Sequence, residues 1–118
     1  MSPPGAEPAD PGPVFQALAD PTRRAVLRDL TVAGSATATQ LAHTLPVSRQ
    51  AVVKHLQLLA DAGLVVSERH GREQRYAASP DALRDAMAWM VDVGARWDDR
   101  LDRLAERVRV RSGGRTVR

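Results

Sequence analysis

Apolar residues recur at helical spacing in several segments of this chain, and turn-forming residues separate the segments. Within residues 48–62, Val52, Leu56 and Leu59 lie three or four positions apart, which predicts an amphipathic helix with one buried face. Val53 widens that face. Similar patterns predict further ordered helical segments at residues 14–19, 20–30, 37–45 and 80–108.

Residues at the ends of these segments support the predicted boundaries. Asp20-Pro21 and Ser79-Pro80-Asp81 each place a helix-capping side chain immediately before a proline, which is favoured in the first turn of a helix. Gly34 ends the second segment, and Gly63 lies where a helix that starts at Ser48 needs a residue beyond its C-terminus.

Between residues 64 and 77 the pattern changes from helical to extended. Residues 64–69 and 74–77 are predicted to form two strands, joined by a turn at residues 70–73 that contains Gly71. Helix, turn, helix and hairpin in this order predict a winged helix-turn-helix. The expected fold is mainly α, with about five helices, a two-stranded wing and a long C-terminal helix.

Composition separates one domain from two terminal segments. Residues 1–13 hold five of the eight prolines, which predicts a disordered lead-in. Residues 109–118 carry four arginines and Gly113-Gly114, and are expected to form a basic flexible tail. The 118-residue chain is long enough for one modest core, so residues 14–108 are assigned to a single domain.

The outer face of the helix from Ser48 has side chains that suit DNA. Arg49 can bind guanine and Gln50 adenine, each through two hydrogen bonds, and Ser48 can bind phosphate while it caps the helix. Lys54 suits a phosphate, and His55 either faces DNA or packs against the preceding helix. The alternative for each of these residues is an ordinary solvated side chain.

The distribution of charge supports the same location. The net charge is +3, but residues 21–79 alone carry eight basic and four acidic side chains. In the predicted hairpin, Arg69, Arg72 and Arg75 are expected to contact phosphate or the minor groove, although arginines near a hairpin tip also serve simply as solvated charges. A double-stranded DNA operator is therefore the expected partner, and residues 14–108 are expected to serve DNA binding and dimerisation.

The last predicted helix carries a heptad pattern, in which apolar positions alternate steps of four and three. This pattern favours a homodimer over packing within one chain, which remains the alternative. The residues expected at the dimer interface are Phe15, Leu83, Met87, Met90, Gly94, Trp97, Leu101 and Leu104. A two-fold dimer presents two recognition helices roughly 34 Å apart and favours an inverted-repeat site.

Other classes of protein are disfavoured by what the sequence lacks. It contains no cysteine, which excludes disulfides and thiolate metal sites. No apolar run approaches the roughly 18 residues needed to cross a bilayer, and the N-terminus does not resemble a secretion signal, so a cytoplasmic location is expected. Without a glycine-rich phosphate loop or a Ser/His/Asp arrangement, no enzymatic activity and no cofactor are expected.

Three blocks of sequence resemble the ArsR/SmtB family of small bacterial winged-helix repressors. They are residues 17–27 (ALADPTRRAVL), 47–56 (VSRQAVVKHL) and 58–65 (LLADAGLV), within a span from Phe15 to about Leu104. The resemblance implies a homodimer that binds operator DNA through the helix from Ser48. It also implies a hairpin that steadies the complex, repression of the protein's own operon and, in many members, release by an effector.

The chain departs from the metal-sensing members of that family. Their third helix begins with a Cys-x-Cys motif, where this chain has Thr37-Ala38-Thr39, and hydroxyls do not replace thiolates for soft metals. Their alternative site on the last helix needs Asp and His ligands, whereas no histidine follows His70 here. No metal site is therefore expected, and the effector is unknown. Two alternatives stay open: a winged helix used for protein contacts, and a sensor with an unrecognised ligand or metal site.

Overall fold

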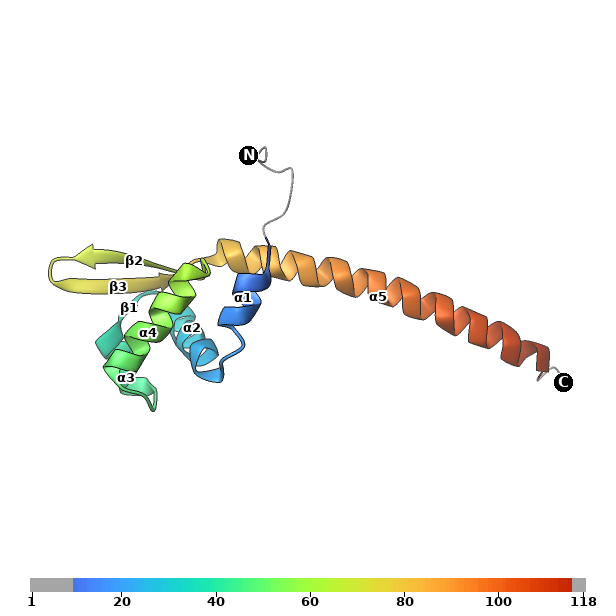
Figure 1. The fold of residues 1–118 in the computed structure, drawn as a ribbon, viewed down its shortest axis with the longest axis horizontal. Coiled ribbons are helices and arrows are strands. Elements are labelled where there is room, and N and C mark those ends of the chain that lie inside the picture. Colours follow the sequence, from blue (N-terminus) through green and yellow to red (C-terminus); the bar gives the residue numbers. More distant parts are fainter. Residues whose placement is uncertain (1–9, 116–118) are drawn as a thin grey trace, which may run out of the picture. The chain divides into compact units, whose positions relative to one another are not determined.

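The computed structural model describes residues 10–115, and the side chains of residues 10–110 (Figure 1). The elements follow the order α1 (Gly12–Ala17), α2 (Pro21–Ala33), β1 (Ala36–Thr37), α3 (Ala38–Thr44), α4 (Arg49–Asp61), β2 (Val65–His70), β3 (Glu73–Ala78) and α5 (Pro80–Arg115). This order confirms the predicted winged helix-turn-helix, in which α3 and α4 form the helix-turn-helix and β2 and β3 the wing. By its internal contacts the chain divides into two units, Met1–Ala86 and Met87–Arg118.

Two of the predicted capping residues, Asp20 and Ser48, begin their helices. The carboxylate of Asp20 accepts a hydrogen bond from the backbone N–H of Arg23 at 2.9 Å, and Pro21 occupies the first turn of α2. The hydroxyl of Ser48 accepts from the N–H of Ala51 at 3.1 Å and starts α4. Gly63 follows α4 with a φ of 82°, a left-handed conformation that favours glycine.

The termini of the helical part differ from the predicted boundaries. Helix α1 begins at Gly12, two residues before the predicted start of order at Val14. Helix α5 continues to Arg115, past the predicted end near Val108 and through part of the predicted flexible tail. Residues 1–9 of the predicted lead-in and residues 116–118 of the tail lie outside the described residues. No helix within residues 10–115 has both the length and the apolar character to cross a membrane.

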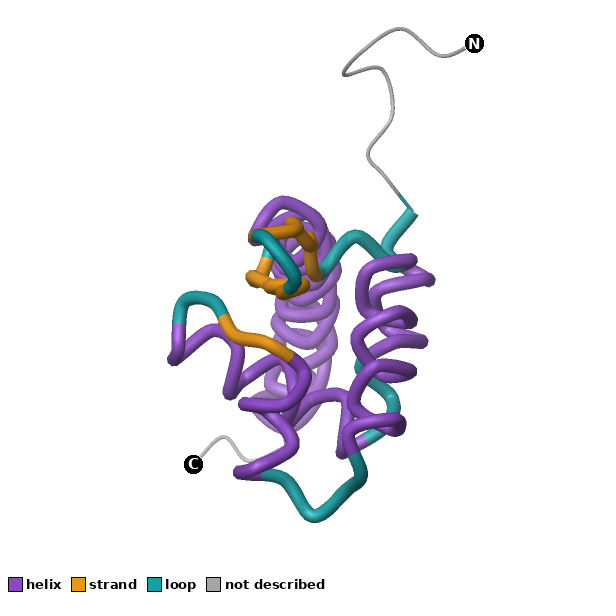
Figure 2. Tube along the Cα trace, turned by 90° about the vertical axis from the view of Figure 1, so that its left-hand side faces the viewer, coloured by secondary structure: helices purple, strands orange, loops and turns teal. Residues whose placement is uncertain are grey.

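The sheet has one strand more than predicted. Its antiparallel order is β1-β3-β2, so the two-residue strand β1 pairs with the wing through Ala36 with Tyr76 and Thr37 with Arg75. The hairpin turn is also shorter than residues 70–73, because the pairing of His70 with Glu73 leaves two residues between the strands. One of them is Gly71, with a φ of 63°. Figure 2 shows the hairpin from its tip.

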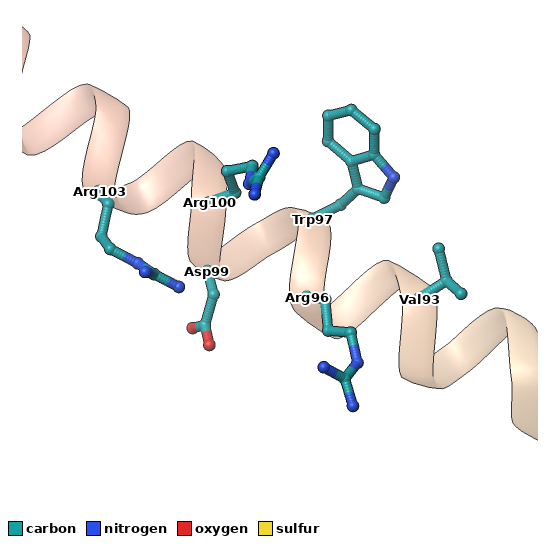
Figure 3. A pocket seen from close by; sticks show the side chains of 6 residues that line it. All are labelled: Val93, Arg96, Trp97, Asp99, Arg100 and Arg103. Atoms are coloured by element: carbon teal, nitrogen blue, oxygen red, sulfur yellow. The ribbon is translucent and has the colours of Figure 1, made fainter.

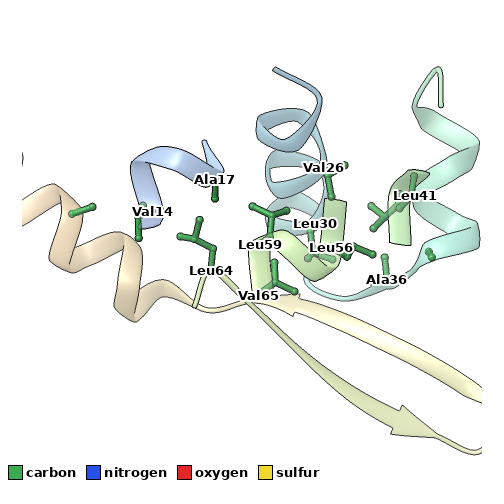
Figure 4. Packing of buried hydrophobic residues seen from close by; sticks show 13 residues of the cluster. Val14, Ala17, Val26, Leu30, Ala36, Leu41, Leu56, Leu59, Leu64 and Val65 are labelled. Atoms are coloured by element: carbon green, nitrogen blue, oxygen red, sulfur yellow. The ribbon is translucent and has the colours of Figure 1, made fainter. Parts of the chain in front are cut away.

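The core of the first unit is apolar and joins all of its helices to the base of the wing (Figure 4). Its largest fully buried side chains are Val26, Leu30, Val52, Leu56, Leu59 and Leu64. The predicted inner face of α4 is therefore confirmed, with Val53 half-buried beside it. Burial of this face fixes the rotation of α4 about its axis, and so determines which of its residues point outward.

Candidate nucleic-acid interface

Helix α4 exposes polar side chains in its first turn. Ser48, Arg49 and Gln50 are exposed, and Lys54 follows them on the outside one turn later. The hydroxyl of Ser48 is engaged in capping the helix. The side chains of Arg49 and Gln50 extend from the end of the helix that, in helix-turn-helix proteins, approaches the base edges.

Two predicted DNA-contacting arginines lie at one hollow between α3, α4 and the wing. The cavity has a volume of about 400 Å³, and its lining includes Arg49 from α4, Arg72 from the hairpin turn, and Thr39 and Gln40 from α3. The Nε–H of Arg49 donates a hydrogen bond to the hydroxyl oxygen of Thr39 at 3.1 Å. The structure thus brings together side chains that are far apart in sequence, in a hollow lined by two arginines and by Glu73.

The cations of the wing lie in different surroundings. Arg69 and Arg72 are exposed. Arg75 lies further from the tip, and its guanidinium contacts the carboxylate of Glu73 at 3.1 Å, with 29% of its side chain exposed. The imidazole of His70 lies 3.4 Å from the carboxylate of Glu68. Arg72 is therefore better placed than Arg75 to meet a phosphate without first giving up a carboxylate partner.

His55 lies apart from the exposed residues of α4. Its side chain is half-buried, and its Nδ1 atom is buried without a hydrogen-bond partner among the described residues. It is close enough to Asp20 for its charge to affect that carboxyl electrostatically. This position matches the packing alternative for His55 more closely than a role in reading DNA.

The fold lowers the pKa of the Asp20 carboxyl below its usual value. The hydrogen bond from the backbone N–H of Arg23 is the main cause that lowers the pKa of the Asp20 carboxyl. The charges of Arg23 and His55 lower it further, while desolvation opposes them. The cap of α2 is therefore a carboxylate that the fold keeps charged.

The two arginines that follow Pro21 hold α1 against α2. The Nε–H of Arg23 donates to the carbonyl oxygen of Ala17 at 2.7 Å, and the guanidinium of Arg24 donates to that of Leu18 at 2.7 Å. Cations suit this place because the last carbonyls of a helix lack partners and carry partial negative charge. From the sequence we predicted no contact for these arginines. Their position just after the predicted break between the first two helices was the signal that could have indicated it.

The predicted dimer face of α5 has two parts. Leu83 is half-buried against the core of the first unit, as is Phe15, the predicted interface residue that lies in α1, and Gly94 of α5 is also half-buried. The large apolar side chains at the heptad positions beyond them are 46% to 58% exposed: Met87, Met90, Trp97, Leu101, Leu104 and Val108. In Figure 3, Trp97 extends from one side of α5 and Arg96, Asp99 and Arg103 from the other. We call the exposed set from Met87 to Val108 the α5 seam.

The described residues contain no group of three or more His, Cys, Asp or Glu side chains arranged to hold a metal ion. Thr37 and Thr39, at the positions of the cysteine motif of metal sensors, make hydrogen bonds within the protein instead.

Comparison with known proteins supports a helix-turn-helix protein. The pattern of a helix-turn-helix domain family matches residues 18–68. The Transcriptional repressor SdpR of Bacillus subtilis is 33% identical over 88 residues, which cover 75% of this chain and 97% of that protein.

Solved structures are similar over most of the chain. An ArsR-like transcriptional regulator from Rhodococcus sp. RHA1 superposes with a TM-score of 0.73 and 42% identity, covering 81% of this chain and 90% of that one. The homodimeric winged helix-turn-helix DNA-binding domain of Mb0332 from Mycobacterium bovis superposes with a TM-score of 0.58 and 28% identity, covering 69% and 76%.

Proposed function

Because this chain belongs to the ArsR family of winged helix-turn-helix transcriptional regulators, we propose that it is a homodimeric repressor that binds an inverted-repeat operator through α4. The observation that carries this proposal is the exposed first turn of α4, with Arg49 and Gln50 in solvent and Val52 fully buried one turn further along the helix. Arginine and glutamine are the side chains that read guanine and adenine in the major groove.

The wing supplies contacts that carry no base information. Arg72 lies at its turn and lines the same hollow as Arg49, so a duplex seated on α4 brings a phosphate or a minor groove to it. Arg69 adds a second exposed cation, while Arg75 contributes less because it is paired with Glu73. We assign α4 to specificity and the wing to affinity.

A second copy of the chain covers the α5 seam in this proposal. Six large apolar side chains, each about half exposed and spaced in heptads, form a patch that proteins rarely leave in water. The homodimeric state of the similar domain from Mycobacterium bovis supports this occupant. Two-fold symmetry then sets two α4 helices on successive major-groove faces, which is why an inverted repeat is the expected operator.

In this proposal the protein represses transcription by occupying a promoter. A dimer bound across a promoter excludes the polymerase, and a relative of the chain is itself named a transcriptional repressor. If the operator lies upstream of the protein's own gene, repression depends only on protein concentration and needs no effector.

The test is selection of duplexes from a randomised pool by the purified protein, in the presence of a chelator. The selected duplex and a scrambled version of it are then compared across a salt series. We expect an inverted repeat, a high ratio of the two affinities, and a steep fall of both affinities with salt because phosphate contacts release counterions. Competition with the protein's own upstream DNA tests autorepression.

If no sequence is enriched and binding stays equally weak for every duplex, the proposal is wrong. In that case the winged helix serves a protein partner.

A further inference from the structure

The two threonine hydroxyls at the start of α3 have different partners. The hydroxyl of Thr37 accepts from the backbone N–H of Gln40 at 3.1 Å, and the Gln40 side chain accepts from the N–H of Thr37 at 2.9 Å. This reciprocal pair closes the end of the helix. The hydroxyl of Thr39 instead accepts from the Nε–H of Arg49, across the gap between α3 and α4.

We propose that Thr39 is a positioning residue, whose hydroxyl sets the plane of the Arg49 guanidinium for base reading. The inference rests on the proposed function, because it concerns how Arg49 meets DNA. A guanidinium is planar and has five N–H donors, so a bond to Nε–H fixes the orientation of the other four. Those four belong to the two terminal nitrogens, which remain available for a bidentate contact with guanine.

The hydrogen bond is expected to favour DNA binding because it orders the Arg49 side chain in the free protein. A long arginine side chain in water samples many rotamers, and fixing one of them on binding opposes association. Thr39 is β-branched and therefore stiff, and it lies in the first turn of a helix whose end is closed by Thr37 and Gln40. A hydrogen bond to such a side chain restricts the rotamers that Arg49 can adopt.

The surroundings of the bond make it more effective in the complex than in the free protein. Thr39 and Arg49 are both exposed, so water competes for their hydrogen bond in the absence of DNA. They line the hollow that also contains Arg72. A duplex seated over this hollow excludes water, and a hydrogen bond to a charged group is stronger where water is excluded.

The test compares two substitutions of Thr39 with a matched control. Thr39→Val keeps the shape of the side chain and removes the acceptor, whereas Thr39→Ser keeps the hydroxyl. Thr31→Val is the control, because the Thr31 hydroxyl bonds only to the carbonyl oxygen of Leu27, at 2.8 Å, within α2. We expect Thr39→Val to lower the ratio of affinities for the selected and scrambled duplexes about fivefold, the size of one hydrogen bond.

We expect the ratio for Thr39→Ser to stay within about twofold of the wild-type ratio, and that for Thr31→Val to be unchanged. Thermal unfolding of all three variants checks that the fold is kept. In the background of Arg49→Ala, adding Thr39→Val is expected to cause no further loss, because the positioned group is already gone.

A second measurement needs no DNA. In the free full-length protein, exchange of the Arg49 Nε–H with water, followed by NMR, is expected to be faster in Thr39→Val than in the wild type. If Thr39→Val leaves both this exchange and the affinity ratio unchanged while the wild type discriminates, the inference is wrong and the proposed function stands. A ratio that rises would mean that the bond withholds Arg49 from DNA, which also overturns it. If the wild type itself does not discriminate, the proposed function fails and the inference fails with it.

Discussion

Helices α4 and α5 carry the same kind of amphipathic pattern, but the chain covers only one of them. On α4 the side chains of Val52, Leu56 and Leu59 are 0% exposed, while on the α5 seam Leu101 is 53% exposed. Hydrophobic periodicity therefore predicts that a face will be covered, and it does not say by what. The contrast separates apolar side chains that stabilise one chain from those that, in our proposal, a second copy covers.

Core truncation tests this contrast most strongly. Leu56→Ala is expected to lower the free energy of unfolding by about 2–5 kcal/mol, because it leaves a cavity in a fully packed core. Leu101→Ala, measured at a dilution where monomers prevail, is expected to change it by less than about 0.5 kcal/mol. Urea unfolding measures both, and equal losses would show that the α5 seam is not an unpartnered surface.

Substitution of charged residues into the α5 seam is expected to have the next largest effect. The double variant Met90→Glu, Leu101→Glu is expected to sediment as a monomer and to bind the selected duplex about 100-fold more weakly, because each half-site is then bound separately. Val32→Glu on α2 is the control, since Val32 is 84% exposed and lies outside the seam. Dimers that survive the double substitution would remove the seam from this role.

Single substitutions at the proposed DNA-contacting residues are expected to have a smaller effect. Substitutions on α4 are expected to change sequence discrimination, and those on the wing overall affinity. Arg49→Ala or Gln50→Ala is expected to reduce the ratio of affinities for selected and scrambled duplexes about tenfold, because each removes a bidentate base contact. Arg72→Ala is expected to weaken binding to both duplexes alike and to flatten the salt dependence. Electrophoretic mobility shifts measure these quantities, with Arg28→Ala on α2 as the control. An unchanged ratio in both α4 variants contradicts their assignment as base readers.

The smallest effect is the pH dependence contributed by Asp20. Its pKa is lower in the folded chain than the usual value of about 3.9, so its charged form stabilises the fold above that pH. This contribution is lost as the pH falls through the lower pKa of the folded state. Asp20→Asn keeps a good capping side chain and removes the charge. We expect the variant to be slightly less stable at neutral pH, with the difference in unfolding free energy vanishing in acid.

Much of the fold could be predicted from local signals. The caps at Asp20 and Ser48, the glycine at position 63 and the inner face of α4 each depend on a few neighbouring residues, and the structure confirms them. The exposed position of Gln50 follows directly from that inner face, whereas Arg49 lies on the same side as Leu56 and is exposed because it is the first residue of the helix. Their contacts with DNA stay a prediction.

Features that depend on distant residues could not be predicted. Strand β1 has only two residues, too few to show an alternating pattern, and it forms because β3 offers it a partner. The bond from Arg49 to Thr39 spans ten positions and depends on how α3 meets α4. For His55 the sequence left DNA contact and packing as alternatives, and the buried Nδ1 atom reflects the packing around α4.

The short strand β1 has a mechanical consequence for the wing. At Arg75 and Tyr76, β3 is paired on both sides, with β1 and with β2, so the wing is three strands wide at its middle. Towards Gly71 the ribbon has only two strands, which makes it more compliant. Since β1 runs directly into α3, the three-stranded part ties the wing to the helix-turn-helix, and the softer tip suits the minor-groove contact that we propose for it.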